Sequence, residues 1–326
     1  SHLDTQPTGG RFDGVYGVLG GLEVIERLND LGIRTEAPIE LVVWTNEEGS
    51  RFQKSMMGSG VWAGVIDEAE ACALVDADGI AVSDELDRLG WRGERPAGPS
   101  PFGAAFELHI EQGPILENDE IEVGIVTGVQ GLRWFTLDLH GFPAHAGPTP
   151  MAGRRDPARV IARIITRVYD MVDEMGEWGR ATFAQFDSWP ISPNTIPERL
   201  SCTLDLRHPD AGVLDRMENE MRRIVDEEGG ACEVGVEVTR RNDSPPVHFD
   251  ENCVAAVESS VADLGFSATR LVSGAGHDAC YVALHGPTSM IFVPCADGLS
   301  HNEAESITKE QAERGASVLL GAVLAQ

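Results

Sequence analysis

The sequence predicts an α/β protein, in which a discontinuous α/β domain carries an inserted α+β domain. The chain has 326 residues, of which 42% are apolar, and this length favours two domains with full cores. Helix and strand patterns alternate at both ends of the chain, whereas its middle has the order βαββαβ, the split-βαβ or ferredoxin-like pattern. We expect the outer domain to comprise residues 1–127 and 245–326, and the inserted domain residues 128–244.

The first part of the outer domain predicts one long helix and two strands. Apolar residues recur at helical spacing over residues 15–31, and Gly32 follows them as a helix stop. Residues 39–45, Ile-Glu-Leu-Val-Val-Trp-Thr, are typical of a buried strand. Residues 90–104 are rich in glycine and proline and predict a loop, and residues 106–110 predict a short strand.

The inserted domain predicts four strands and two helices. The strands are expected at residues 132–140, 181–187, 200–207 and 232–240. Asp156 is an N-cap followed by proline at the first helical position, and the helix that it begins is expected to end at Gly176. A second helix is expected over residues 210–228, closed by the two glycines that follow.

The last part of the chain returns to α/β alternation. It predicts a helix over residues 252–264, a buried strand over residues 288–293 and a final helix over residues 308–324. Thr308 and Gln311 have the spacing of a capping box at the start of that helix.

Charge and cysteine content argue against several classes of partner. The net charge is −28, which disfavours nucleic acid and anionic membranes. Only two residues are lysines, and an acidic surface with little lysine is typical of proteins from salt-loving organisms.

None of the six cysteines forms a Cys-x-x-Cys pair, so we expect reduced, mostly buried thiols. With no apolar run of about 20 residues and no visible signal peptide, we expect a cytoplasmic protein.

Histidines and carboxylates gather in five segments where predicted strands end and loops begin. In chain order these are Ser1-His2-Leu3-Asp4-Thr5, Gly10-Arg11-Phe12-Asp13-Gly14, Asn46-Glu47-Glu48-Gly49, Leu108-His109-Ile110-Glu111-Gln112-Gly113 and Leu299-Ser300-His301-Asn302-Glu303. Each segment alone is better explained as an ordinary turn or loop. Their joint occurrence favours one site, because ligands of open α/β sheets bind beyond the carboxyl ends of the strands.

The residue types in these segments favour two borderline metal ions. Such ions bind imidazole nitrogens and carboxylate oxygens at about 2.0–2.2 Å. A shared carboxylate can hold two ions about 3.5–4 Å apart, so that they activate one water and polarise a carbonyl. Of the adjacent pair Glu47 and Glu48, one can bind metal while the other takes the proton from the water. Asp4, two residues after His2, can orient that imidazole from outside the ligand set.

Seven motifs together resemble one enzyme family. They are His-Leu-Asp-Thr, Gly-Gly-Arg-Phe-Asp-Gly, Glu-Glu-Gly-Ser-Arg-Phe, His-Ile-Glu-Gln-Gly-Pro, His-Ala-Gly-Pro-Thr-Pro-Met, Gly-His-Asp-Ala and Ser-His-Asn-Glu. In this order they resemble the N-carbamoyl-L-amino-acid hydrolase and allantoate amidohydrolase family, a branch of the di-zinc aminoacylase and carboxypeptidase superfamily (peptidase M20-like). The resemblance covers essentially the whole chain, and its third and fourth motifs are far more specific than the superfamily's general His-x-Asp.

This resemblance implies a di-metal hydrolase domain with a role for each matching residue. His2 and His109 would bind one metal ion, Glu48 and His301 would bind the other, and Asp13 would bridge both. Glu47 would be the general base. Zinc is the first candidate for both divalent ions, with manganese, cobalt and nickel as alternatives.

The resemblance also implies how substrate is held. Asn194 and Arg207 of the inserted domain would bind the substrate's carboxylate, for which a guanidinium is well suited. His145 would stabilise the oxyanion and would reach the site from the partner subunit of a homodimer, so the inserted domain would be a dimerisation domain or lid. Gln112 and His277 are further candidates for the substrate pocket.

We therefore expect a hydrolase of linear amides that cleaves the carbamoyl C–N bond of N-carbamoyl-L-amino acids. Allantoate and β-ureidopropionate are alternative substrates, and a dipeptidase or N-acyl amino-acid deacylase is a second enzymatic interpretation. The family has several dozen residues ahead of its His-x-Asp motif, so a chain starting at Ser1 also suggests a fragment or a misplaced start, with His2 on a frayed terminus. On that interpretation the chain would be an inactive homologue that acts as a binding protein.

Overall fold

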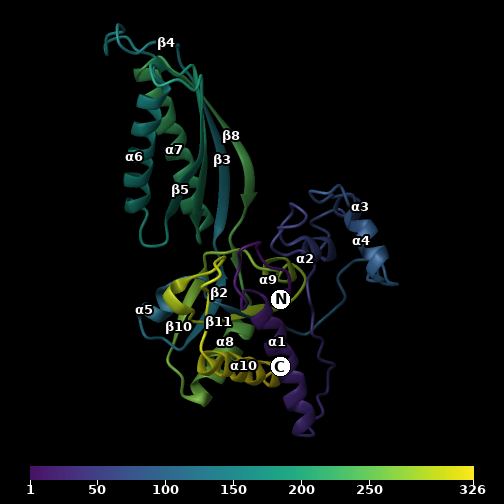
Figure 1. The fold of residues 1–326 in the computed structure, drawn as a ribbon. Coiled ribbons are helices and arrows are strands. Elements are labelled where there is room, and N and C mark those ends of the chain that lie inside the picture. The colour runs from purple at the N-terminus through teal and green to yellow at the C-terminus, as the bar shows by residue number, and fades with distance from the viewer. The chain divides into compact units, whose positions relative to one another are not determined.

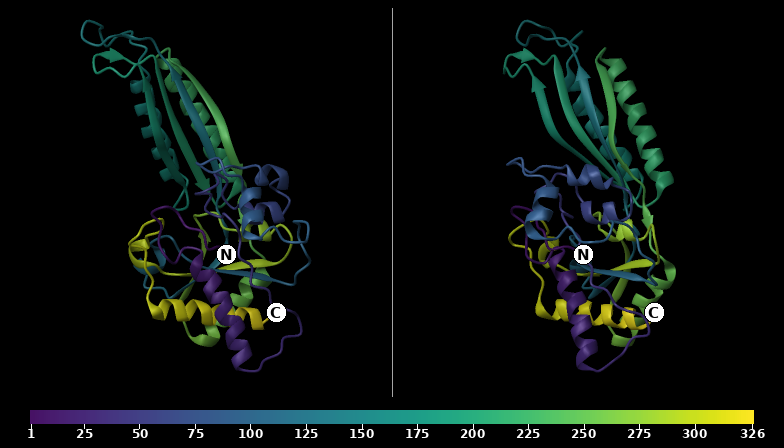
Figure 2. Two further views of the ribbon diagram at one scale, coloured as in Figure 1. Left: turned by 45° about the vertical axis from the view of Figure 1, so that its right-hand side comes forward. Right: turned by 90° about the vertical axis from the view of Figure 1, so that its right-hand side faces the viewer.

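The computed structural model describes residues 1–326 as two compact units. One comprises Ser1–Val129 and His248–Gln326, and the other comprises Gln130–Val247. The chain therefore crosses between the units after Val129 and after Val247, two to three residues beyond the predicted positions. Figures 1 and 2 show the ribbon from three directions. No helix in either unit has both the length and the apolar character needed to cross a membrane.

The first unit is built on a sheet with the strand order β1-β11-β2-β10. Its strands are β1 (Ala105–Ile110), β2 (Val123–Val129), β10 (Ala268–Ser273) and β11 (Thr288–Val293), with the short β9 (Val247–His248) at the unit boundary. β1 runs parallel to β11 and β10 parallel to β2, whereas β11 and β2 are antiparallel. All six residues of β11 are buried, as expected for a strand covered on both faces.

Helices α1 (Val15–Asp30), α8 (Glu251–Leu264) and α10 (Lys309–Leu324) pack against this sheet (Figure 1). The predicted capping box begins α10: Thr308 accepts the N–H of Gln311, and the Gln311 side chain accepts the N–H of Thr308. The remaining helical segments are short and were not predicted. They are α2 (Met57–Trp62), α3 (Glu68–Cys72), α4 (Val82–Leu89), α5 (Ile115–Asn118), α9 (Ala279–Val282) and the 3₁₀ turn η1 (Ala296–Gly298).

The predicted strand at residues 39–45 is wrong. This segment forms a single bridge, between Trp44 and His2, and no ladder continues from it. Leu41, Val42 and Val43 are exposed rather than buried. An apolar, β-branched run becomes a strand only where neighbouring backbone pairs with it along its length. This segment pairs with Ser1 and His2 and accepts one further bond, from Gly58 to Thr45.

The second unit has the predicted βαββαβ order. Its strands β3 (Gly131–His140), β5 (Arg180–Trp189), β7 (Arg199–His208) and β8 (Gly235–Ser244) form an antiparallel sheet in the order β5-β7-β3-β8. Helices α6 (Pro157–Glu174) and α7 (Ala211–Ala231) pack against it, and β4 (Ala144–His145) pairs with β6 (Thr195–Ile196) in a separate two-stranded ribbon. Leu200, Cys202, Leu204 and Leu206 alternate into the core, as their spacing predicted.

Two boundaries in this unit differ from the predictions. Asp156 caps α6 as expected, by accepting the N–H of Ala158. However, α7 continues through Gly229 and Gly230 to Ala231, because glycine weakens a helix without ending one that is held by packing. The last strand accordingly begins at Gly235 instead of residue 232.

Candidate active site

The two carboxylate oxygens of Asp13 face two different groups of side chains. Oδ1 lies 3.6 Å from Nε2 of His2 and 3.2 Å from Nε2 of His109. Oδ2 lies 3.4 Å from Nε2 of His301, which is in turn 3.3 Å from Oε2 of Glu48. The groups His2–Asp13–His109 and Asp13–Glu48–His301 each have ligand atoms within 4.8 Å of one another. All five predicted metal-binding side chains therefore lie together, with Asp13 common to both groups.

These side chains come from segments far apart in the sequence. His109 is near the end of β1, His301 follows η1, and Asp13 precedes α1. The close approach of the Asp13 loop to His2 requires Gly14, since a Cβ there would lie 2.3 to 2.4 Å from ring atoms of His2, and its φ is +70°. His2, Asp13 and His109 are buried, Glu48 is half-buried and His301 is exposed, so the site is open on the side of His301.

Hydrogen bonds direct the Nε2 atoms of two histidines toward Asp13. Nδ1 of His2 donates to the carbonyl oxygen of Asp4 at 2.9 Å, and Nδ1 of His109 donates to that of Ile110 at 2.9 Å. Both rings therefore keep Nε2 for another partner, which for His109 is the N–H of Gly14 at 3.2 Å. A carbonyl-anchored imidazole is the usual arrangement of a metal-binding histidine.

The electrostatics indicate a site that requires positive charge. Burial would lower the pKa of His2, but its hydrogen bond to Asp13 and the charge of Glu47 raise that pKa to about 10. Hydrogen bonds to Asp13 and Glu48 likewise raise the pKa of His301 to about 10. Burial opposes ionisation of Asp13, yet the three histidines hold its pKa far below the usual range. Protons on His2 and His301 thus balance the carboxylates, and a cation can replace them.

Glu47 lies beside these groups without belonging to either. Its Oε2 is 3.5 Å from Nε2 of His2, and its side chain is buried. Burial, together with the charges of Asp278, Glu107 and Glu48, raises the pKa of Glu47 to about 9, although His2 opposes the shift. A carboxyl group with this pKa holds a proton at neutral pH, and cations bound beside it would lower the pKa and free the carboxylate to act as a base.

Asp4 contacts the His2 ring through its main chain rather than through its side chain. Its carboxylate lies 3.8 Å from Nδ1 of His2, and the Asp4 main-chain oxygen accepts from that ring instead. The carboxylate accepts the backbone N–H groups of Glu47 at 3.2 Å and Glu48 at 3.1 Å. Asp4 therefore holds the Glu47–Glu48 turn, because its short side chain reaches the two adjacent donors of that turn.

Gln112 and His277, predicted for the substrate pocket, both lie at this cluster. The Gln112 amide nitrogen donates to Oδ2 of Asp13 at 2.8 Å, from a backbone with φ +57° that is uncommon outside glycine. His277 is buried, with its ring 4.7 Å from that of His109 between centroids. Burial and the charge of His109 lower the pKa of His277 to about 3, so this imidazole is neutral and its Nε2 lies 2.9 Å from Oγ of Ser273.

Sequence reasoning missed three side chains that contact the cluster. Gln6 donates to Oε2 of Glu48 at 2.8 Å, and Ser300 Oγ lies 2.8 Å from Oδ2 of Asp13. Glu305 accepts the backbone N–H of Asp13 at 3.0 Å. Their only signal in the sequence is proximity to predicted ligands, which does not reveal the direction of a side chain.

In the second unit, His145 and Asn194 lie on the same ribbon. His145 is opposite Thr195 in the β4–β6 pair, and the N–H of Ala146 donates to the carbonyl oxygen of Asn194 at 2.8 Å. Nδ1 of His145 accepts the N–H of Gly147 at 3.1 Å. The neutral ring therefore carries its proton on Nε2, which is exposed and available as a donor.

Arg207 lies at the other end of the same unit. It pairs with Leu132 at the start of β3, whereas Arg199 pairs with His140 at the end of that strand. From Arg199 to Arg207, β7 covers about 26 Å at 3.3 Å per residue. The ribbon adjoins the Arg199 end, since β6 ends three residues before Arg199, and Figure 1 shows β4 at that end of the unit. Nε and Nη2 of Arg207 donate to the carboxylate of Asp205, the shortest contact being 2.7 Å.

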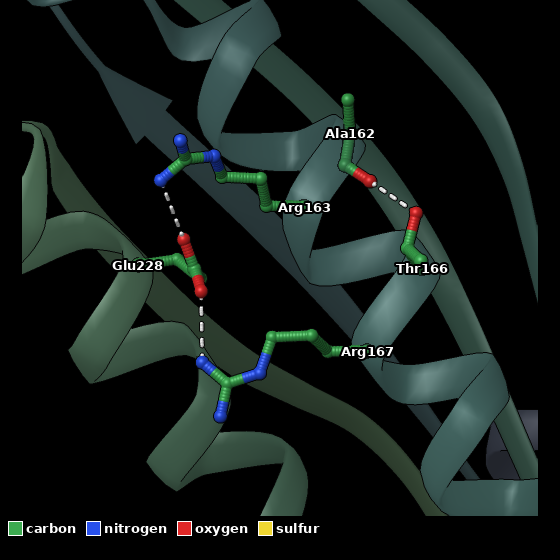
Figure 3. Close-up of a pocket in the computed structure, with 5 residues that line it drawn as sticks. All are labelled: Ala162, Arg163, Thr166, Arg167 and Glu228. Atoms are coloured by element: carbon green, nitrogen blue, oxygen red, sulfur yellow. Dashed lines mark hydrogen bonds and ion pairs between the residues drawn. The ribbon is translucent and has the colours of Figure 1, made fainter.

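A cavity of about 430 Å³ between α6 and α7 contains none of the predicted site residues (Figure 3). It is lined by Ala162, Arg163, Thr166, Arg167 and Glu228. Glu228 accepts from Arg163 at 3.3 Å and from Arg167 at 2.8 Å. Arg167 also pairs with Glu227 at 2.7 Å, so both arginines of this cavity are engaged in ion pairs.

Comparison with known proteins agrees with the motifs. An N-carbamoyl-L-amino-acid amidohydrolase of Rhizobium meliloti is 46% identical to this chain. The match covers 99% of this chain and 78% of the relative's length. An allantoate amidohydrolase of Bacillus subtilis is 34% identical over 98% of this chain and 78% of its own length. Among solved structures, an amidase of the hydantoinase/carbamoylase family from Burkholderia multivorans superposes with a TM-score of 0.96 at 49% identity, covering 99% of this chain and 79% of that one.

The family described as peptidase family M20/M25/M40 matches residues 1–325. The relatives of this chain include N-carbamoyl-L-amino-acid amidohydrolases and an allantoate amidohydrolase. These are the two activities that the motifs indicated. This chain is therefore a member of peptidase family M20/M25/M40.

Proposed function

We propose that this protein is a metal-dependent amidohydrolase that cleaves the carbamoyl C–N bond of N-carbamoyl-L-amino acids. The observation that carries the proposal is the pair of side-chain groups that share Asp13. Shared carboxylates of this kind hold two metal ions in hydrolases. The relatives that are 46% and 40% identical to this chain are both N-carbamoyl-L-amino-acid amidohydrolases.

The donor set fits two divalent ions. His2, His109 and Asp13 would hold one, and Asp13, Glu48 and His301 would hold the other. Imidazole and carboxylate ligands suit zinc, and also manganese, cobalt and nickel. When bound, the ions would lower the pKa of a water and polarise the carbamoyl oxygen.

The chain's own residues would supply the proton transfers. Glu47 would take a proton from the attacking water as a new C–O bond forms at the carbamoyl carbon. The C–N bond to the amino acid would then break, with Glu47 returning the proton to the leaving nitrogen. The other product, a carbamic acid, decomposes to ammonia and carbon dioxide. His145, which carries its proton on Nε2, would donate to the oxyanion of the tetrahedral intermediate.

The positions of His145, Asn194 and Arg207 support a homodimer. His145 and Asn194 lie at the end of the inserted sheet opposite to Arg207. A substrate smaller than this sheet cannot contact both ends within one copy. Recognition by all three residues therefore requires Arg207 from one subunit and the His145–Asn194 ribbon from another. In this arrangement the inserted unit would be a dimerisation domain, with the two-fold symmetry usual for homodimers.

Allantoate is the second candidate substrate, because relatives with that activity are 34% identical to this chain. Allantoate and N-carbamoyl-amino acids both carry a ureido group near a carboxylate, and β-ureidopropionate shares these features. Arg207 and Asn194 would bind the carboxylate in each case.

An assay of ammonia release on a panel of substrates tests this proposal. The metal-loaded protein is offered N-carbamoyl-L-amino acids, allantoate, β-ureidopropionate and, with amine detection, dipeptides and N-acyl amino acids. We expect the highest kcat/KM for an N-carbamoyl-L-amino acid, and loss of that activity when a chelator removes the metal. Preference for allantoate would identify the second candidate. No turnover of any substrate by metal-loaded protein would indicate a binding protein and contradict the proposal.

A further inference from the structure

Glu305 is a buried carboxylate for which the proposed reaction assigns no role. It lies between η1 and α10, four residues after His301, and only 3% of it is exposed. Burying a carboxylate is costly unless hydrogen bonds compensate its charge. The contacts of Glu305 therefore show what it is for.

Both oxygens of Glu305 lie against loops that carry candidate metal ligands. Oε1 accepts the backbone N–H of Phe12 at 2.9 Å and that of Asp13 at 3.0 Å. Oε2 lies 3.2 Å from the hydroxyl of Ser300, the residue before His301. One side chain thus joins the loop that carries Asp13 to the loop that carries His301.

The same network reaches the carboxylate of Asp13. The Ser300 hydroxyl is 2.8 Å from Oδ2 of Asp13, and the Gln112 amide donates to Oδ2 at 2.8 Å and to the Ser300 hydroxyl at 3.0 Å. Glu305 holds the backbone of Asp13, while Ser300 and Gln112 orient its side chain. The direction of Oδ2, which faces His301 and Glu48, depends on all three.

Its partners distinguish Glu305 from a metal ligand. No lysine or arginine forms an ion pair with Glu305, and it belongs to neither group of candidate ligands. Two backbone N–H groups supply its compensation instead, and the Ser300 hydroxyl, which is closer to Asp13, lies beside its other oxygen. Oxygens that are already engaged in this way anchor the loops rather than bind an ion.

The backbone beside Glu305 leaves room for this side chain. A Cβ on Gly10 would lie 2.2 to 2.4 Å from Glu305 side-chain atoms. Gly10 has a negative φ that alanine can also adopt. Gly10→Ala therefore displaces Glu305 without removing its charge.

We propose that Glu305 is a positioning residue that fixes Asp13 between the two metal sites, by tying its backbone to the loop of His301. The inference rests on the proposed metal centre. It predicts that Glu305 controls how tightly the chain binds its ions, although it touches neither ion nor substrate. Partners of this kind outside the ligand set change metal affinity about 10- to 100-fold.

Zinc titrations of metal-free protein by calorimetry test the proposal. The variants are Glu305→Ala, Glu305→Gln and Gly10→Ala, and the control is Glu303→Gln, which removes one negative charge from an exposed position in the same loop. We expect the wild type to bind two ions per chain. Glu305→Ala and Gly10→Ala should bind at least one of these ions about 10- to 100-fold more weakly. Glu305→Gln should lose less affinity, because its amide oxygen still accepts the backbone hydrogen bonds. Glu303→Gln should match the wild type.

Thermal melts of the metal-free proteins separate a positioning role from a general structural one. If Glu305→Ala fails to fold, the milder Gly10→Ala and Glu305→Gln decide the question. Lower melting temperatures with unchanged zinc affinity in these variants would overturn the inference. If the wild type takes up no zinc, the proposed metal centre itself fails, and with it this inference. If the wild type binds two ions and every folded variant does so equally well, only this inference fails.

Discussion

Glu47 and Glu48 are adjacent in the chain but have different surroundings. Glu48 faces His301 and accepts a hydrogen bond from Gln6. Glu47 is buried beside His2, and this burial, with the charge of Asp278, raises its pKa. We predict that Glu47→Gln keeps both metal ions and lowers kcat by about 10²–10⁴, the range for loss of a general base. Parallel measurement of kcat and metal content checks this. Near-wild-type turnover in a metal-replete Glu47→Gln protein would show that another group accepts the proton.

Asp4 gives a second prediction at this scale, because its carboxylate holds two backbone donors. Asp4→Asn retains one acceptor oxygen but loses the charge that both N–H groups share. We expect the Glu47–Glu48 turn to loosen and kcat to fall more than KM rises, with Asp4→Ala affected more strongly than Asp4→Asn. Equal, near-wild-type kinetics of both variants would remove any functional role for this carboxylate.

The sequence predicted which residues gather around Asp13 better than it predicted their contacts. His109 lies near the end of β1, as the sequence predicted, whereas the strand expected before Glu47 and Glu48 is absent. The residue types of the five segments were therefore a better guide than the strands expected beside them. The side-chain direction of Asp4 and Glu305 depends on backbone donors contributed by other loops. The spacing of residues in the sequence does not predict these contacts between a side chain and the backbone of another loop.

Among the secondary-structure elements, the β4–β6 ribbon leads to the sharpest test. It carries His145 and Asn194, at the end of its unit opposite to Arg207. Subunits with Glu47→Gln and subunits with His145→Ala are each expected to be inactive as homodimers. When they are mixed, a hybrid dimer has one site with both native residues, so activity should return to about half that of a wild-type dimer. This follows because the two substitutions then fall in different sites.

The control for this experiment is proof of subunit exchange, for example by native mass spectrometry. Hybrid dimers that form and remain inactive would mean that His145 does not act across the interface. A monomeric wild type would contradict the dimer proposal outright.

Elements with strong local signals were predicted closely. The helix caps at Asp156 and Thr308, and the alternation along β7, depend on neighbours within one turn or strand. β2 and β10 were not predicted: β2 contains two glycines, and β10 contains the charged residue Arg270. The segment 39–45 was predicted as a strand but forms only one bridge, and strand formation depends on such non-local pairing.

At the scale of the whole molecule, the charge of −28 is distributed over a chain with two lysines. Self-repulsion at low ionic strength destabilises the folded state, and molar salt reduces the screening length to about 3 Å. We therefore predict that the melting temperature rises between low salt and molar potassium chloride. Thermal denaturation followed by circular dichroism at constant pH checks this. A melting temperature that is unchanged or lower in molar salt would argue against adaptation to salt.

The central claim is that Asp13 joins two metal sites, and anomalous X-ray diffraction from crystals grown with zinc tests it most directly. We predict two anomalous peaks about 3.5–4 Å apart, one within bonding distance of His2 and His109, the other within bonding distance of Glu48 and His301, with Asp13 contacting both. A single peak, or peaks that do not contact Asp13, would contradict the account.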